Sequence, residues 1–359
     1  MKMHIELQRT FGQYTEPQSE DGDVDWHQYF SSNRRRLNWD DLHQNRVTVV
    51  LGEAGIGKTA ELQLQAERMK AAGRFSFFVP LNTLASDSWD STLEDSLSSF
   101  QTWLHSSEDG FFFLDAVDEA RLQTHADFKR AISVVRTALT PNIAHARIAI
   151  SSRVTDWTVP DVQKAVATSL LKPINLAVAQ ARDLIRASVA ADASAPSRAP
   201  AEARGEEVPT TSSGGPDGLV VVTLDALSKE DAHHCARFYK LEDEVGFWSA
   251  VEEGDYEFMA SRPLDLQWMV KLWNSRRVLG SYAELIEANV TERLREPNDL
   301  YRHAKRSLAE ARLREGATEL AAAMEFGGIA FISVRHGGAV NGRVIDAFEV
   351  LRTWTPDEV

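Results

Sequence analysis

Residues 52–59 read G-E-A-G-I-G-K-T, and this run limits the fold more than any other feature of the chain. The residues before it, 46–51, are apolar and β-branched, as in a buried parallel strand. The residues after it, 60–72, repeat apolar side chains at helical spacing and stop before Gly73. Strand, glycine-rich loop and helix, in this order, are the context in which a phosphate-binding loop occurs. A chance match to the loop pattern alone is uncommon, and this context makes it rarer.

Such a loop binds a nucleotide through its backbone. Its N–H groups converge on the phosphates, and the N-terminus of the following helix adds partial positive charge. We expect Lys58 to reach the β- and γ-phosphates, and the hydroxyl group of Thr59 to bind Mg²⁺. The residues expected to contact the nucleotide are Gly52, Glu53, Ala54, Gly55, Ile56, Gly57, Lys58 and Thr59.

Composition indicates a globular protein of the reducing cytoplasm. With 359 residues the chain is long enough for two or three domains. Its 39 basic and 53 acidic side chains give a net charge of −14, which disfavours nucleic acid and anionic membranes as partners. Cys235 is the only cysteine, which excludes a disulfide framework and a zinc cluster. We expect no signal peptide and no membrane span.

From residue 46 onward, strand and helix patterns alternate, which predicts an α/β fold with a parallel five-stranded sheet and helices on both faces. The expected strands are 46–51, 75–79, 110–114, 146–151 and 219–223. The stretch at about 190–217 is rich in Ala, Ser, Pro, Gly and Glu, and we interpret it as a disordered insertion. We expect the domains to be an N-terminal extension at 1–44, a nucleotide-binding core at 45–224, a helical domain at 225–300 and a final region at 301–359.

A second motif, at residues 115–119, contains three acidic side chains. The apolar strand 110–114 is followed by Asp115, and Asp118 and Glu119 come shortly after it. A metal–triphosphate complex needs an acid at a strand end to hold Mg²⁺, which suits Asp115. It also needs an acid to position the attacking water, and Glu119 with Asp118 is the candidate. Alternatively, Asp118 and Glu119 cap the helix that follows.

These two motifs together resemble the NACHT family within the STAND class of P-loop NTPases, which is marked by an aspartate, a small residue, an apolar residue and Asp-Glu. Residues 115–119, D-A-V-D-E, match that pattern position by position. The strand ending at Arg153 resembles the family's sensor strand, which implies that Arg153 reads the γ-phosphate. Residues 261–266, S-R-P-L-D-L, resemble the proline motif of the family's helical lid. This implies that Pro263 packs near the nucleotide, with a weaker match at Arg262.

The resemblance implies an ATP hydrolase that works as a switch, in which exchange of ADP for ATP opens the lid and leads to homo-oligomerisation. Bacterial relatives of this kind serve in anti-phage defence, so we expect an unidentified trigger ligand and an effector elsewhere. Residues 225–300 would be the helical lid, and 301–359 would be a partial winged-helix-like region of a longer, truncated protein. The resemblance covers about 46–270.

Three other functions stay open. A constitutive AAA+-type ATPase that remodels protein or nucleic acid would share the fold, but it normally has Asp-Glu directly after the strand, where this chain has Asp115-Ala116. A small-molecule kinase needs an arginine-rich lid and an acceptor site, and neither is evident. A nucleotide-stabilised scaffold without hydrolysis is disfavoured by the complete set of acids.

Overall fold

The computed structural model describes residue 5 and residues 7–14, 36–116, 125–157, 160–192, 218–295, 309–327, 331–333 and 344–354. The chain divides into two compact units. The first unit contains Met1–Tyr239 and Phe258–Gln267, and the second contains Lys240–Glu257 and Trp268–Val359. The segments 225–239 and 258–267 thus belong to the first unit.

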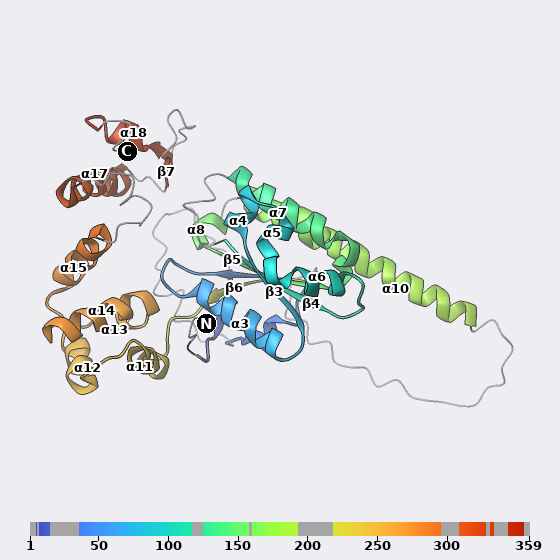
Figure 1. Ribbon diagram of the computed structural model, residues 1–359, viewed down its shortest axis with the longest axis horizontal. Coiled ribbons are helices and arrows are strands. Elements are labelled where there is room, and N and C mark those ends of the chain that lie inside the picture. The colour runs from blue at the N-terminus through green and yellow to red at the C-terminus, as the bar shows by residue number, and fades with distance from the viewer. Residues whose placement is uncertain are drawn as a thin grey trace. The chain divides into compact units, whose positions relative to one another are not determined.

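The first unit is built on a six-stranded sheet with the strand order β1-β6-β2-β5-β4-β3 (Figure 1). The strands are β1 (Phe11–Gln13), β2 (Val47–Leu51), β3 (Phe75–Pro80), β4 (Gly110–Asp115), β5 (Ala146–Ser152) and β6 (Leu219–Leu224). Strands β2 to β6 are parallel to one another, and β1 pairs with β6 in the antiparallel sense. The fold is therefore α/β with a mostly parallel sheet, as the sequence predicts.

The predicted strand count of five is wrong, because β1 adds a sixth strand at the edge. β1 has only three residues, one of them Gly12, so it carries no readable alternation of apolar and polar side chains. Its register is set by pairing with a strand far along the chain, with Phe11 opposite Leu224. Part of the predicted N-terminal extension therefore belongs to the sheet.

Side chains of the parallel strands alternate between two apolar cores, as the period of a strand requires. One core contains Val50 and Phe113 together with residues of α2 (Trp39–Leu42) and α3 (Lys58–Ala71). The other contains Val49 and Leu114 and is covered by helices on the opposite face. These helices are α4 (Leu81–Ser86), α5 (Trp89–Leu93), α6 (Leu97–Leu104), α7 (His125–Leu139), α8 (Val154–Trp157), α9 (Pro160–Val166) and α10 (Lys172–Asp192). Both faces are thus covered, as expected for parallel strands.

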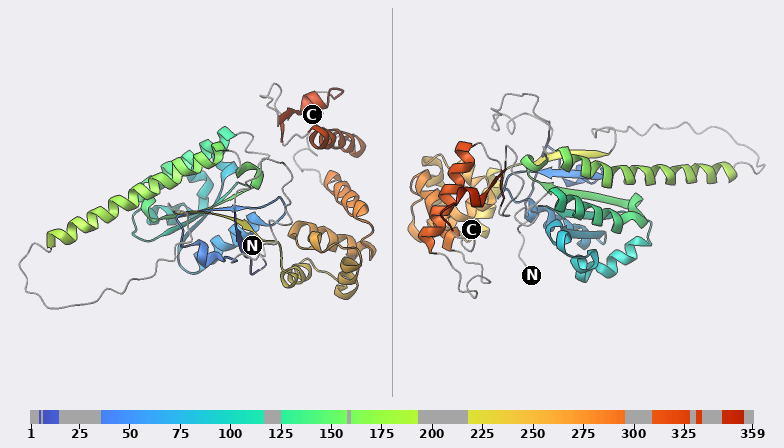
Figure 2. Two further views of the ribbon diagram at one scale, coloured as in Figure 1. Left: turned by 180° about the vertical axis from the view of Figure 1, so that it is seen from behind. Right: turned by 90° about the horizontal axis from the view of Figure 1, so that it is seen from above.

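Helix α10 is the longest helix of the first unit and extends past the sheet (Figure 2). It contains residues 190–192, which the sequence places in the disordered insertion. The rest of that predicted insertion lies outside the described residues.

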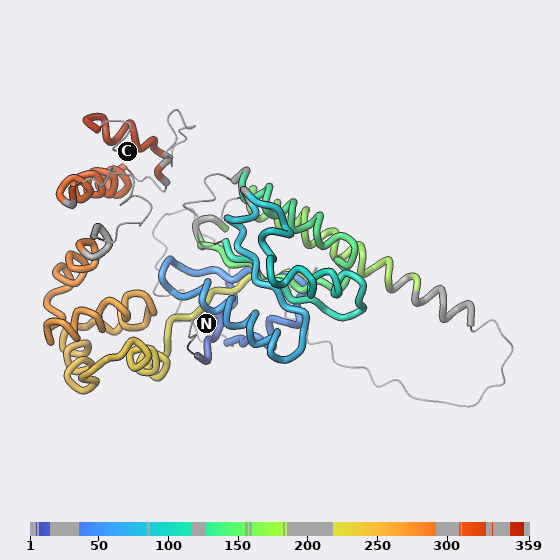
Figure 3. The backbone as a smooth tube through the Cα atoms, in the orientation of Figure 1, coloured from blue at the N-terminus to red at the C-terminus, as the bar shows by residue number. Residues whose placement is uncertain are grey.

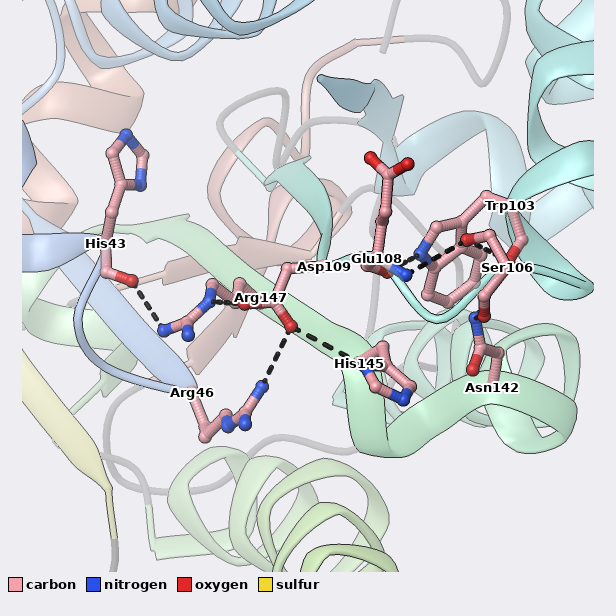
Figure 4. Close-up of polar contacts among 9 residues, drawn as sticks. All are labelled: His43, Arg46, Trp103, Ser106, Glu108, Asp109, Asn142, His145 and Arg147. Atoms are coloured by element: carbon pink, nitrogen blue, oxygen red, sulfur yellow. Dashed lines mark hydrogen bonds and ion pairs between the residues drawn. The ribbon is translucent and has the colours of Figure 1, made fainter.

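A polar cluster joins the amino ends of β2, β4 and β5 (Figure 4). Asp109, just before β4, accepts a 2.6 Å hydrogen bond from Arg147 Nε and lies 3.4 Å from Arg46 Nη1. Arg147 Nη1 also donates to the carbonyl oxygen of His43 across 2.7 Å. Because parallel strands run the same way, this cluster lies at the end of the sheet opposite to their carboxyl ends, and it holds three neighbouring strands in register.

Where the structure describes it, the second unit is helical apart from two short strands. It contains α12 (Glu244–Glu253), most of α14 (Pro263–Arg276), α15 (Tyr282–Arg295), α17 (Glu310–Gly327) and α18 (Ala347–Val350), with the parallel pair β7 (Phe331–Ser333) and β8 (Val344–Asp346). Phe247 and Trp273 pack edge to face with ring centroids 5.9 Å apart. The guanidinium carbon of Arg312 lies over the ring of Trp354, 4.0 Å from its centroid. The winged-helix-like identity of 301–359 stays a prediction. No helix in the described part of the chain is long and apolar enough to cross a membrane.

Candidate functional site

The glycine-rich loop lies between β2 and α3, as the sequence predicts. Gly55 and Gly57 have positive φ angles of 82° and 98°, a backbone conformation that side chains disfavour. Gly57 directly precedes the first residue of α3, Lys58, so the loop feeds into the N-terminus of a 14-residue helix. The loop therefore ends at the positive end of a helix dipole, which suits an anion.

Lys58 is buried, with 3% of its surface exposed, and its side chain turns back over the loop. Its Nζ donates to the carbonyl oxygens of Gly52 at 2.5 Å and Glu53 at 2.9 Å. The ammonium group is therefore held beside the first two residues of the loop. Thr59 is half-buried in the first turn of α3.

Asp115 ends β4 and is buried. Its Oδ1 accepts a 2.6 Å hydrogen bond from the hydroxyl group of Ser151 on β5. The same hydroxyl oxygen accepts from the backbone N–H of Ala116 at 3.0 Å. Ser151 therefore fixes both the carboxylate of Asp115 and the turn of the chain after β4.

Arg153 follows β5, the strand that lies between β2 and β4. Leu51 of β2 pairs with Ser152, and Leu114 of β4 pairs with Ile150. The glycine-rich loop, an arginine and a carboxylate thus follow one another at the carboxyl ends of three adjacent strands. The half-buried Arg153 also begins α8, because its carbonyl oxygen accepts from the N–H of Trp157 at 3.1 Å. The other two predicted catalytic residues, Asp118 and Glu119, lie outside the described residues.

Pro263 lies against the glycine-rich loop although 206 positions separate it from Gly57. Its Cγ is 3.4 Å from the point that a Cβ atom on Gly57 would occupy. The next residue, Leu264, donates its backbone N–H to the carbonyl oxygen of Gly55 at 3.3 Å. The first turn of α14 therefore packs on the loop, and the structure brings Pro263 and the loop together, as the sequence leads us to expect.

Arg9 also contacts the loop, and the sequence analysis missed it. Its guanidinium group donates to the carbonyl oxygen of Ile56 at 3.2 and 3.3 Å and to that of Asp225, just after β6. Figure 3 traces the backbone from the N-terminal segment, in dark blue, to the C-terminal helix, in red. Burial lowers the pKa of Arg9, while Glu61 opposes this effect. A single arginine in a short polar segment carries no pattern from which this role is readable.

Behind the loop, the buried Glu61 accepts a 2.7 Å hydrogen bond from Trp39 Nε1. Burial raises the pKa of Glu61. Helix α11 (Lys229–Phe238) carries the fully buried Cys235, and burial raises the pKa of its thiol to about 11.

The residues present fit a magnesium nucleotide by their donor chemistry. A threonine hydroxyl and an aspartate carboxylate are the hard oxygen ligands that Mg²⁺ takes in company with phosphate oxygens. No cluster of three or more His, Cys, Asp or Glu side chains suited to a metal occurs among the described residues.

Comparison of the chain with protein-family models finds no match, and comparison with curated proteins finds none either.

Proposed function

We propose that this protein binds ATP and ADP with Mg²⁺ at the loop 52–59, hydrolyses ATP, and works as a nucleotide-dependent switch. The observation that carries the proposal is the order of groups along the carboxyl edge of the sheet. The loop follows β2, Arg153 follows β5 and Asp115 ends β4. In an open α/β sheet, ligands bind at this edge. The resemblance of residues 115–119 to the NACHT motif supports the same function.

Each residue has a physical role in this proposal. Lys58 gives up its contacts with loop carbonyl oxygens and pairs with the β- and γ-phosphates. Thr59 and Asp115 hold Mg²⁺, which neutralises phosphate charge. Glu119, with Asp118, positions the attacking water. Arg153 gains a charge-assisted hydrogen bond only when a γ-phosphate is present, so it distinguishes ATP from ADP.

The switch requires that the nucleotide interacts differently with two arrangements of the protein. Pro263 and Leu264 belong to the proposed lid and touch the loop, which supports coupling between nucleotide and lid. Homo-oligomerisation, a trigger ligand and an effector in anti-phage defence complete the proposal by resemblance to the NACHT family alone.

The first experiment is to denature freshly purified protein and identify the released nucleotide by chromatography, with Lys58→Ala as the comparison. We expect about one ADP per chain from the natural sequence and none from the variant. Nucleotide retained by Lys58→Ala would contradict the site. A protein that is purified without bound nucleotide and hydrolyses ATP steadily without a partner would contradict the switch. It would favour the constitutive AAA+-type ATPase.

A further inference from the structure

Two arginines from distant parts of the chain hold the outer side of the phosphate loop. Arg262 Nη2 donates to the carbonyl oxygen of Ala54 across 2.7 Å. Arg9 donates to the carbonyl oxygen of Ile56 at 3.2 and 3.3 Å. The carbonyl oxygen between them, that of Gly55, accepts from a backbone N–H of α14. Three consecutive carbonyl groups are therefore bonded from outside the loop.

This arrangement fixes the direction of the N–H groups. In a planar trans peptide unit the C=O and N–H bonds point in opposite directions. The N–H of Ile56 donates to the carbonyl oxygen of Glu53 within the loop at 3.4 Å. Bonds to the carbonyl groups of Ala54 and Ile56 therefore direct the N–H groups of Gly55 and Gly57 to the opposite side of the loop, where phosphates would bind. A loop fixed in this way loses less conformational entropy on binding and so binds more tightly.

Arg262 is itself held in place by carboxylates. Its Nε lies 3.3 Å from Asp265 Oδ2, and its Nη2 lies 3.6 Å from Glu53 Oε2. Its side chain is 23% exposed, so its substitution should disturb the fold less than substitution of the buried Arg9. Arg262 belongs to Phe258–Gln267, a segment of the first unit whose neighbours on both sides in the sequence belong to the second unit.

We propose that Arg262 and Arg9 are positioning residues that shape the phosphate loop from its carbonyl side without touching the nucleotide. The inference rests on the proposed function and extends it. Because the loop and the segment 258–267 share hydrogen bonds, nucleotide binding stabilises that segment, and the segment in turn raises nucleotide affinity. The loop is thereby linked to a chain segment more than 200 positions away.

Binding of fluorescent ADP and ATP analogues tests this role. Arg262→Ala should weaken both by the same factor, on the order of tenfold, because it removes a charge-assisted hydrogen bond to the loop and no contact with the γ-phosphate. Arg262→Lys should recover part of the affinity.

Two other variants serve as comparisons. Arg153→Ala should weaken the binding of ATP alone. Arg130→Ala, which removes an exposed arginine on α7, should change neither. Unchanged affinities in Arg262→Ala would overturn the proposal.

Hydrogen exchange without nucleotide separates this inference from the proposed function. In Arg262→Ala, peptides that contain Leu264 should exchange faster, because the N–H of Leu264 is bonded to the loop, while peptides of β4 keep their rates. Equal exchange in the variant and the natural sequence would contradict the positioning role of Arg262, whether or not the protein binds nucleotide. Faster exchange in the variant, in a protein that binds no nucleotide, would support the positioning role of Arg262 and contradict the proposed function.

Discussion

At the scale of the single residue, the hydroxyl group of Ser151 has the best-defined position near the proposed metal site. It has no exposed surface and joins Asp115 to the backbone of Ala116. Ser151→Ala should release the carboxylate, so that ATP hydrolysis needs a several-fold higher Mg²⁺ concentration. The loss of a buried hydrogen bond should also lower the free energy of unfolding by about 1–3 kcal/mol.

The measurements are a Mg²⁺ titration of ATPase activity and a urea denaturation curve. Ser249→Ala is the matched control, because Ser249 also donates to a carboxylate, that of Glu253 at 2.9 Å, but on an exposed helix surface. The control should leave both quantities unchanged. A Mg²⁺ dependence in Ser151→Ala equal to that of the natural sequence would show that Asp115 needs no such support.

His43, at the opposite end of the sheet, predicts a pH dependence of stability. Burial lowers its pKa from 6.5 to about 4, while Asp40 opposes the shift. Its Nε2 lies 2.7 Å from Gln65 Nε2, and its ring stacks on Trp39 with centroids 5.4 Å apart. Between about pH 6.5 and pH 4 the unfolded chain binds a proton at this position that the folded protein does not bind. Stability from this group is therefore complete above about pH 6.5 and is lost as the pH falls to about 4.

The expected loss is up to about 3 kcal/mol at pH 4. The measurement is the free energy of unfolding in urea at several pH values between 7 and 4, for the natural sequence and for His43→Gln. The variant should show a shallower dependence on pH. An identical slope would mean that His43 titrates normally in the folded protein.

Residues with a motif around them could be predicted, and residues defined only by packing could not. The sequence places Gly52, Asp115 and Arg153 at the ends of strands, and the register of β2, β5 and β4 brings those ends together. The role of Arg9 depends on a fold-back over 47 positions, which no local pattern records. Ser151 was missed for a related reason, because its partner is on a neighbouring strand.

At the scale of the element, β1 shows how a short strand is stabilised by its side chains. Phe11 has no exposed surface and packs edge to face on Trp39, with ring centroids 5.0 Å apart. Phe11→Ala should lower the free energy of unfolding by about 3–5 kcal/mol, because it leaves a cavity in the core under α2 and α3. Because Arg9 precedes β1, the variant should also weaken nucleotide binding.

Urea denaturation and nucleotide titration measure the two effects. Phe326→Ala is the control, because Phe326 is 90% exposed on α17 and its removal opens no cavity. Equal stability of Phe11→Ala and the natural sequence would mean that β1 is not part of the folded sheet in solution.

The parallel strands were predictable because each is a buried run of apolar residues of ordinary strand length, bounded by turns or polar residues. The order in which they lie was not, since it depends on long-range pairing. That order matters for function, because the placement of β5 between β2 and β4 inserts Arg153 between the loop and the acid.

At the scale of the whole molecule, the proposed switch predicts that nucleotide state controls assembly. Glu119→Gln should bind ATP but hydrolyse it at least a hundredfold more slowly, because the water is no longer activated. The variant should therefore accumulate the ATP-bound state and form larger species. Light scattering after size-exclusion chromatography, with ATP and with ADP, measures this. Unchanged turnover would remove Glu119 from its role, and a monomer with bound ATP would contradict assembly driven by ATP alone.

The burial of Cys235 makes the protein suited to site-specific labelling. The chain has one cysteine, it is fully enclosed, and its thiol stays protonated at the pH of maleimide chemistry because its pKa is about 11. Cysteines introduced at exposed positions, one in each unit, would therefore react without background from the natural thiol. A pair of dyes at such positions would report the distance between the units in single molecules as ADP is exchanged for ATP.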